Sequence, residues 1–213
     1  MDGKNLVLLD NKCAISPILG VVLMLLLTIV LAGITVSAVY SDEMLSSMKP
    51  TPVADIDVIY IEGGLPKYPH YVKYEENFIY VRHMGGEPLS LDSTKIVING
   101  MGSAYEGVVP HGTLHTGAIF ISYDDLYFDG KDSDYSSNNQ VLSDGLWSTG
   151  EELILNGQDG ISSVSTVYVT INGVTNTSNN YGLKENTMIT IKIFDIQTQR
   201  LIAESECQVT LAE

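Results

Sequence analysis

The pattern of hydrophobic positions divides the chain into two parts with different periodicities. Residues 15–40 contain no charged side chain. At about 1.5 Å per residue, an uninterrupted helix over these positions reaches about 39 Å, which exceeds the ~30 Å hydrocarbon thickness of a bilayer. A buried helix of a soluble protein rarely runs this far without a polar face. The stretch therefore predicts a membrane-spanning helix.

From residue 54 onwards, hydrophobic and polar residues alternate in short runs, which is typical of β-strands. Turn signals such as Gly85-Gly86, Asn99-Gly100 and Asn172-Gly173 separate the runs. The predicted strands cover residues 56–61, 78–83, 95–98, 117–122, 164–171, 188–193 and 201–211. The pattern predicts an α+β protein, in which a long N-terminal hydrophobic helix precedes an all-β, antiparallel, sandwich-like head domain.

Basic residues flank the apolar stretch unevenly. Lys4 and Lys12 precede it, and Lys49 is the first basic residue after it. Because lysine and arginine stay on the cytoplasmic side, this asymmetry predicts a cytoplasmic N-terminus. Everything after the span then faces the outside of the cell.

The charge balance excludes one large class of partners. The 213 residues include 26 Asp and Glu against 11 Lys and Arg, for a net charge of −15. Neutralising phosphates requires a basic stripe, whereas the basic residues here are spread singly along the chain. We therefore expect no nucleic acid as partner.

The short polar head before the apolar stretch is compatible with more than one route of processing. A secretory signal peptide ends in a small-x-small cleavage site, which Val36-Ser37-Ala38 supplies, although the apolar stretch is long for a signal peptide. A lipoprotein places its acceptor cysteine after the apolar run, whereas Cys13 stands before it. The remaining interpretation is a short charged leader followed by a long helix.

The segment Ala14-Ile15-Ser16-Pro17-Ile18-Leu19-Gly20-Val21-Val22-Leu23-Met24 resembles the N-terminus of archaeal type IV pilins. That family has a small residue, an aliphatic residue, Ser-Pro, two aliphatics, Gly and then a long apolar helix. The resemblance implies that a prepilin peptidase cuts between Ala14 and Ile15. Family leaders usually carry a charged residue directly before the small one, whereas Cys13 intervenes here. Cleavage between Cys13 and Ala14 would restore that spacing, so this bond is the alternative.

The residues of the helix agree with this resemblance on physical grounds. Ser16 is a good N-cap and Pro17 suits a first turn, so we expect the helix to start there. Gly20, Ala32 and Gly33 allow neighbouring helices to pack closely. A retained leader would bring its charges into such a bundle at a cost of several kcal/mol each, and cleavage removes that obstacle.

Pattern and resemblance together predict three parts: a cleaved leader at residues 1–14, a transmembrane and filament-core helix at 15–49, and an extracellular β-rich domain at 50–213. The segments HMGGEPL at 83–89 and WSTGEEL at 147–153 also look like elements of archaeal pilin head domains, where we expect them to form turns and core edges.

The resemblance implies a structural subunit of an archaeal type IV pilus-like surface filament that serves adhesion. The implied partners are further copies of the chain in a helical homopolymer, a prepilin peptidase, an assembly ATPase, a membrane platform protein and, before assembly, the membrane. The precursor would lie in the cell membrane and the mature chain on the cell surface. The alternative is a membrane-anchored extracellular binding module for a sugar or a protein that does not polymerise.

The outer domain offers little that indicates chemistry, so we expect no enzyme and no cofactor. His111-x-x-x-His115 has ligand-like spacing but lies in a Gly-rich loop that enters a strand. The stretch from 124 to 134 is rich in aspartate and is either an exposed acidic loop or a weak calcium site, although it departs from the EF-hand pattern. Its candidate ligands are Asp125, Asp129, Asp132 and Asp134.

Two further residues carry predictions. Asn176-Thr177-Ser178 is an N-glycosylation sequon in a polar stretch, so we expect Asn176 to be exposed and to accept a glycan. Cys207 is in phase with Leu201, Ala203, Val209 and Leu211 on the last strand, and we expect all of them to face inward. Cys13 leaves with the leader, so no intrachain disulfide is expected.

Overall fold

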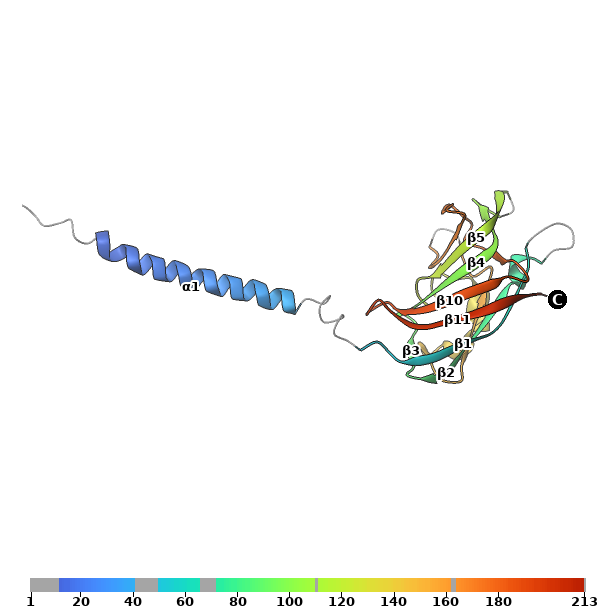
Figure 1. Cartoon of the computed structure of the whole chain (residues 1–213), viewed down its shortest axis with the longest axis horizontal. Helices are drawn as coiled ribbons and strands as arrows, with labels where there is room; N and C mark the ends of the chain where they lie inside the picture. The colour runs from blue at the N-terminus through green and yellow to red at the C-terminus, as the bar shows by residue number, and fades with distance from the viewer. Residues whose placement is uncertain (1–11, 41–49, 66–71, 110, 162–163, 213) are drawn as a thin grey trace, which may run out of the picture. The chain divides into compact units, whose positions relative to one another are not determined.

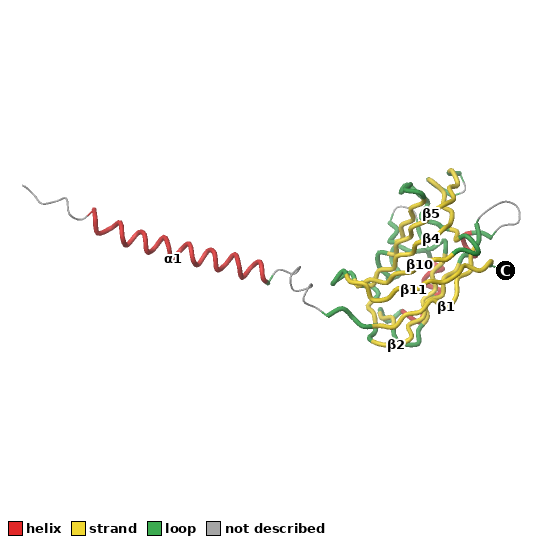
Figure 2. Tube along the Cα trace, viewed as in Figure 1, coloured by secondary structure: helices red, strands yellow, loops and turns green. Residues whose placement is uncertain are grey.

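The computed structural model describes residues 12–40, 50–65, 72–109, 111–161 and 164–212, with side chains from Pro17 onwards. The chain divides between Lys49 and Pro50 into two compact units. The first unit contains the helix α1 (Lys12–Val39) and the second is the β-rich head domain. Figures 1 and 2 show these two parts.

The helix α1 is 28 residues long and begins at Lys12. The predicted start at Ser16 and Pro17 is therefore wrong for the uncleaved chain, because Pro17 lies inside the helix. The physical reason is that Lys12, Cys13 and Ala14 are compatible with helix and extend it upstream of the proline. Pro17 then lacks the N–H that would bond to the carbonyl four residues earlier, which weakens this first part of the helix.

The head domain is built from short strands with two small helical insertions. The bounds of its elements are β1 (Ala54–Gly63), η1 (Tyr74–Glu76), β2 (Phe78–Gly86), β3 (Leu89–Ser90), β4 (Thr94–Glu106), β5 (Thr113–Tyr123), α3 (Ser133–Asn138), η2 (Gln140–Leu142), β6 (Leu146–Trp147), β7 (Glu152–Asn156), β8 (Val167–Ile171), β9 (Gly182–Leu183), β10 (Met188–Asp195) and β11 (Arg200–Leu211).

Nine of these strands form one curled sheet, a half-barrel. Its order is β7-β2-β1-β11-β10-β4-β5-β8, with β9 paired to β4. Figure 1 shows β10 and β11 between β4–β5 and β1–β2. All pairs are antiparallel except β1 with β11, which run parallel. This confirms the predicted class, an N-terminal apolar helix followed by a mostly antiparallel β domain.

The core lies inside the curl of the sheet. Alternate residues of each strand point into it, including Ile61, Ile79, Ile98 and Ile121, which are fully buried. Side chains from α3, η2 and the β3–β6 pair complete the core with Tyr135, Leu142, Leu89 and Trp147. A half-barrel leaves one side of its interior without strands, and these insertions cover the apolar surface there.

Three predictions about the strands need correction. Asn99-Gly100 is no turn, because both residues lie inside β4 and pair with Phe120 and Ile119 of β5. The glycine has a packing reason instead, since the side chain of Ile189 occupies the space where a Cβ would stand. The strand predicted from residue 164 begins at Val167, and the short strands β3, β6, β7 and β9 were missed.

The prediction for the last strand is right for Val209, which is buried, and partly right for Ala203 and Cys207, which pack half-buried against the core. It is wrong for Leu201 and Leu211, which are 45% and 58% exposed. Leu201 leaves the inward phase because a bulge lies between the pairs Ile193–Ala203 and Phe194–Leu201. Leu211 is the last residue of the strand.

Candidate functional site

The most prominent functional feature is the uncovered apolar surface of α1. Within the segment Pro17–Val39, the most apolar 18-residue window has a mean hydropathy of 2.8, and none of that window is buried within the chain. Met24, Ile29 and Ile18 are 70%, 67% and 66% exposed. A helix that is apolar on all sides is covered by lipid or by other protein in its working state. By length and composition it can cross a membrane, and a signal sequence near the N-terminus would look the same.

Small and hydroxyl-bearing residues adapt this helix to apolar surroundings. No atom lies within 4 Å of a Cβ built at Gly20 or at Gly33. At 3.6 residues per turn these two glycines lie about 140° apart around the axis, so close approach is available on more than one side. The hydroxyls of Thr28 and Thr35 donate to backbone carbonyls at 2.8 and 2.9 Å within the helix. Neither hydroxyl therefore needs a partner outside.

The predicted cleavage bonds lie at the start of α1. Ala14–Ile15 and the alternative Cys13–Ala14 both belong to the first turn of the helix in the uncleaved chain. The side chains of Cys13, Ala14, Ile15 and Ser16, and the leader up to residue 11, lie outside the described part of the chain.

The segment HMGGEPL fixes the neck, which we define as residues 51–54, where the chain enters the head domain. Val53 donates its N–H to the Glu87 carboxylate at 3.0 Å, and Glu87 returns an N–H bond to the Val53 carbonyl at 2.8 Å. Gly86 has φ +102°, and a Cβ there would collide with the carbonyl of Val53. Only glycine therefore suits this close approach.

The segment WSTGEEL contacts His83, which in turn contacts Glu87, the partner of the neck residue Val53. The His83 N–H donates to the Glu151 carbonyl at 3.0 Å, and Gly150 donates to the His83 carbonyl at 2.7 Å. The imidazole Nε2 lies 2.9 Å from the Glu87 carbonyl, and the Trp147 ring meets the imidazole edge-on at 5.9 Å. His83 and Trp147 are fully buried. WSTGEEL thus turns at Thr149 and Gly150, and both segments lie at the edge of the core through the buried His83 and Trp147, as predicted. Gly85-Gly86, predicted as a turn, instead forms the last two residues of β2.

The acidic loop contains a buried cation that the sequence did not indicate. The Lys131 side chain is fully buried and donates to the Asp125 carboxylate at 2.9 Å, the Tyr127 carbonyl at 2.6 Å and the Thr166 hydroxyl at 2.8 Å. Burial lowers the pKa of Lys131, and the Asp125 carboxylate opposes that shift. Three acceptors for three ammonium hydrogens leave this charge fully satisfied.

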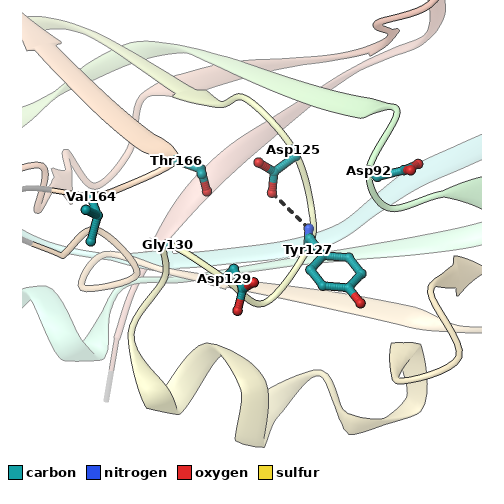
Figure 3. A pocket seen from close by; sticks show the side chains of 7 residues that line it. All are labelled: Asp92, Asp125, Tyr127, Asp129, Gly130, Val164 and Thr166. Carbon is teal, nitrogen blue, oxygen red and sulfur yellow. Dashed lines mark hydrogen bonds between the residues drawn. The ribbon is translucent and has the colours of Figure 1, made fainter.

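The structure does not gather the calcium candidates into a site. Asp125 is neutralised by Lys131, and the tight turn around it is closed by the Tyr127 N–H, which donates to its carboxylate at 3.0 Å (Figure 3). Asp132 caps α3 by accepting from the Asp134 N–H at 3.0 Å. Asp129 is exposed beside a cavity of about 420 Å³. Within the described residues, no three His, Cys, Asp or Glu side chains converge as metal ligands would.

A buried carboxyl group, which no pattern in the sequence singles out, lies in the head-domain core. Asp159 is 1% exposed and accepts from the Asn156 N–H at 2.7 Å and the Tyr123 hydroxyl at 2.8 Å. The Tyr123 hydroxyl also lies 2.8 Å from that of Tyr181. Burial raises the pKa of Asp159 to about 7, against the lowering effect of these hydrogen bonds and of Lys131. Alternation could have suggested the inward tyrosines, but not their acidic partner.

The remaining candidates are placed as follows. Asn176 is exposed, and its backbone carbonyl accepts from Gly107 at 2.9 Å. His115 on β5 lies 2.9 Å from the Glu106 carboxylate of β4, whereas His111 lies in the turn before β5. His111 thus lies in a turn and His115 lies in a strand beside Glu106, so the two histidines do not form a ligand pair.

No sequence profile of a known protein family matches the chain. A protein of Archaeoglobus fulgidus, described only as uncharacterized, is 28% identical over 92 residues, which make up 43% of this chain and 55% of that protein. The chain thus spans about half the length of the curated relative it matches. An N-terminal apolar helix followed by a β-rich domain is an architecture compatible with that of pilins.

Proposed function

We propose that this protein is the structural subunit of an archaeal type IV pilus-like surface filament that serves attachment to surfaces. The observation that carries the proposal is the helix α1, which exposes apolar side chains on every side and contains the pilin-like segment Ala14–Met24. The head domain then coats the filament on the outside. In this proposal the subunit itself performs no chemistry.

The physical chemistry of α1 suits transfer from lipid into a helix bundle. Both surroundings are apolar, so the transfer exchanges one set of dispersion contacts for another at little net cost. Gly20 and Gly33 permit close helix contacts on different sides, as a subunit surrounded by several neighbours requires. The internal hydrogen bonds of Thr28 and Thr35 leave no unsatisfied hydroxyl on these two residues in either setting.

Leader removal by a prepilin peptidase also suits the position of Pro17. In the uncleaved chain Pro17 lies inside α1, where its missing N–H costs a hydrogen bond. After cleavage before Ile15, Pro17 would lie in the first turn, where no helical partner exists for that N–H. Cleavage therefore removes both the leader charges and the unfavourable position of this proline. An assembly ATPase and a membrane platform protein complete the proposed machinery.

The experiment that tests the proposal is mass spectrometry of the N-terminal peptide of the protein recovered from the cell surface, with electron microscopy of the same fraction. A start at Ile15 or Ala14 in a filamentous fraction supports a processed pilin. A start at Met1 without filaments contradicts it and indicates an anchored binding module. A start at Val39 also contradicts it, because that chain would be freely secreted.

A further inference from the structure

The outer surface of the head-domain sheet divides into an acidic half and an uncharged half. On the acidic half, Asp55 and Asp57 of β1 are exposed, and so are Glu204 and Glu206 of β11. Lys192 of β10 lies opposite Glu204 of β11 and forms an ion pair with it at 3.1 Å. On its other side Lys192 lies opposite Val97 of β4, where the uncharged half begins.

The uncharged half lies at outward positions of β4, β5 and β8 whose inward neighbours are buried. It is bordered by the ion pair of Lys95 with Asp124 at 2.6 Å and by Glu106 at the far end of β4. Cross-strand pairing aligns these positions in rows: Asn99 lies opposite Phe120, which lies opposite Thr170. Met101, Phe120 and Tyr168 are 40%, 42% and 50% exposed. We call this surface the neutral face; it consists of Val97, Asn99, Met101, Ala118, Phe120, Tyr168 and Thr170.

The free edge of β8 beside this face is closed to backbone pairing. The Val169 carbonyl accepts from the Thr177 hydroxyl at 2.7 Å, and the Val169 N–H donates to the Asn179 side chain at 3.3 Å. Side chains thus occupy the groups that an added strand would use. A partner at this face consequently makes contact through the side chains of the sheet surface.

The charge distribution identifies which partner suits the neutral face. With a net charge of −15, two copies of this chain repel each other wherever their acidic surfaces meet. Like charges placed against each other oppose association, whereas the neutral face adds no charge to a contact. Aromatic and methionine side chains such as those of Phe120, Tyr168 and Met101 are also enriched in protein interfaces.

From this distribution we infer that the neutral face binds a second copy of the chain, at the contact between neighbouring head domains. The inference rests on the proposed filament and adds to it the face through which the heads meet. The acidic half then points to solvent, where its charges are hydrated and screened by salt.

The first test introduces charge on the neutral face of the full-length chain. Phe120→Glu and Thr170→Glu are compared with Gln208→Glu, which adds the same charge at an exposed position of β11. We expect the face variants to yield at least tenfold fewer filaments at equal subunit amounts in the membrane, whereas Gln208→Glu and the conservative Phe120→Leu assemble normally. If both face variants assemble like the unsubstituted chain, the inference is wrong and the proposed filament stands.

The second test identifies the partner directly. Phe120, or Gln208 as control, is replaced by the photoreactive p-benzoylphenylalanine, and the crosslinked product is weighed by mass spectrometry. A product of twice the subunit mass, formed from position 120 and not from 208, supports the inference. No product, or a product with a different protein or a glycan, overturns it. This result also decides the inference if the unsubstituted chain makes no filaments, an outcome that contradicts the proposed function.

Discussion

The buried carboxyl of Asp159 should make the stability of the head domain fall as the pH rises. Burial raises its pKa in the folded chain to about 7, from an ordinary value of 3.8. A group whose folded pKa is raised binds a proton more tightly in the folded state, so its stabilising contribution is complete below pH 3.8. The contribution is lost between pH 3.8 and pH 7, and nothing further is lost above that.

The magnitude follows from the width of this window. Each pH unit inside it costs about 1.4 kcal/mol of unfolding free energy, so the two units between pH 5 and pH 7 cost about 3 kcal/mol. The charged and titratable groups around Asp159 are Tyr123, Tyr181, Tyr135, Lys131 and Asp132. Burial holds the pKa of each of the three tyrosines well above 10, so they stay neutral throughout this range.

The single tryptophan makes this prediction measurable in the full chain. Trp147 is fully buried in the head domain, so its fluorescence reports unfolding of that domain while α1 stays in a detergent micelle. Urea unfolding of the unsubstituted chain and of Asp159→Asn is compared at pH 5, 6, 7 and 8. The introduced amide keeps an acceptor oxygen for Asn156 and Tyr123 but cannot ionise. The difference between the two chains should change by about 3 kcal/mol from pH 5 to pH 8.

A difference that stays constant with pH would refute the reasoning, because Asp159 would then titrate at an ordinary pKa. Other carboxyl groups titrate in both chains and cancel in the comparison. Because the difference is taken at each pH, a general loss of stability in Asp159→Asn does not imitate the effect.

Four other predictions follow from the same structure. Ala14→Arg should leave membrane insertion intact but stop leader removal and filament formation; normal fibres of uncleaved protein, seen by immunoblot and microscopy, would contradict it. Gly20→Leu should reduce assembly by preventing close helix contact, with Ile29→Leu as a control of unchanged assembly. Gly86→Ala should destabilise the head domain by about 2 kcal/mol or more, because φ is +102° and the added Cβ would collide with the Val53 carbonyl of the neck. Gly150→Ala, at φ +92° with open space around it, is the matched control and should cost less in urea unfolding. Asn176→Gln should remove any glycan mass from the mature chain without changing tryptophan-monitored unfolding, since Asn176 is exposed.

Parts of the candidate site could be read from the chain because they depend on neighbours in sequence. The exposed apolar helix follows from a long stretch without charge, and the predicted position of Asn176 at the surface follows from a polar run. The burial of Lys131 beside Asp125 could not be predicted in this way, because Thr166, which also accepts a hydrogen bond from Lys131, comes from a segment far along the chain. Acidic loops look alike in sequence whether a calcium ion or a lysine neutralises them.

The class of the fold was determined by the sequence alone. A span without charge predicts a helix through length and hydropathy, and period-two alternation predicts strands whose one face is buried. Both signals are local, because each depends on geometry repeated within a few residues. The start of α1 at Lys12 shows the limit of such signals, since residues that merely tolerate helix extended it past Pro17.

Only the tertiary structure decided which strands meet and which side chains share a surface. Strand β1 pairs in parallel with β11, and Val53 exchanges hydrogen bonds with Glu87, although these residues are distant in sequence. Asp159 is likewise buried by residues from other parts of the chain. The neutral face exists because β4, β5 and β8 pair in a register that aligns Asn99, Phe120 and Thr170. Register is set by the packing of the whole curled core, and no single strand carries that information.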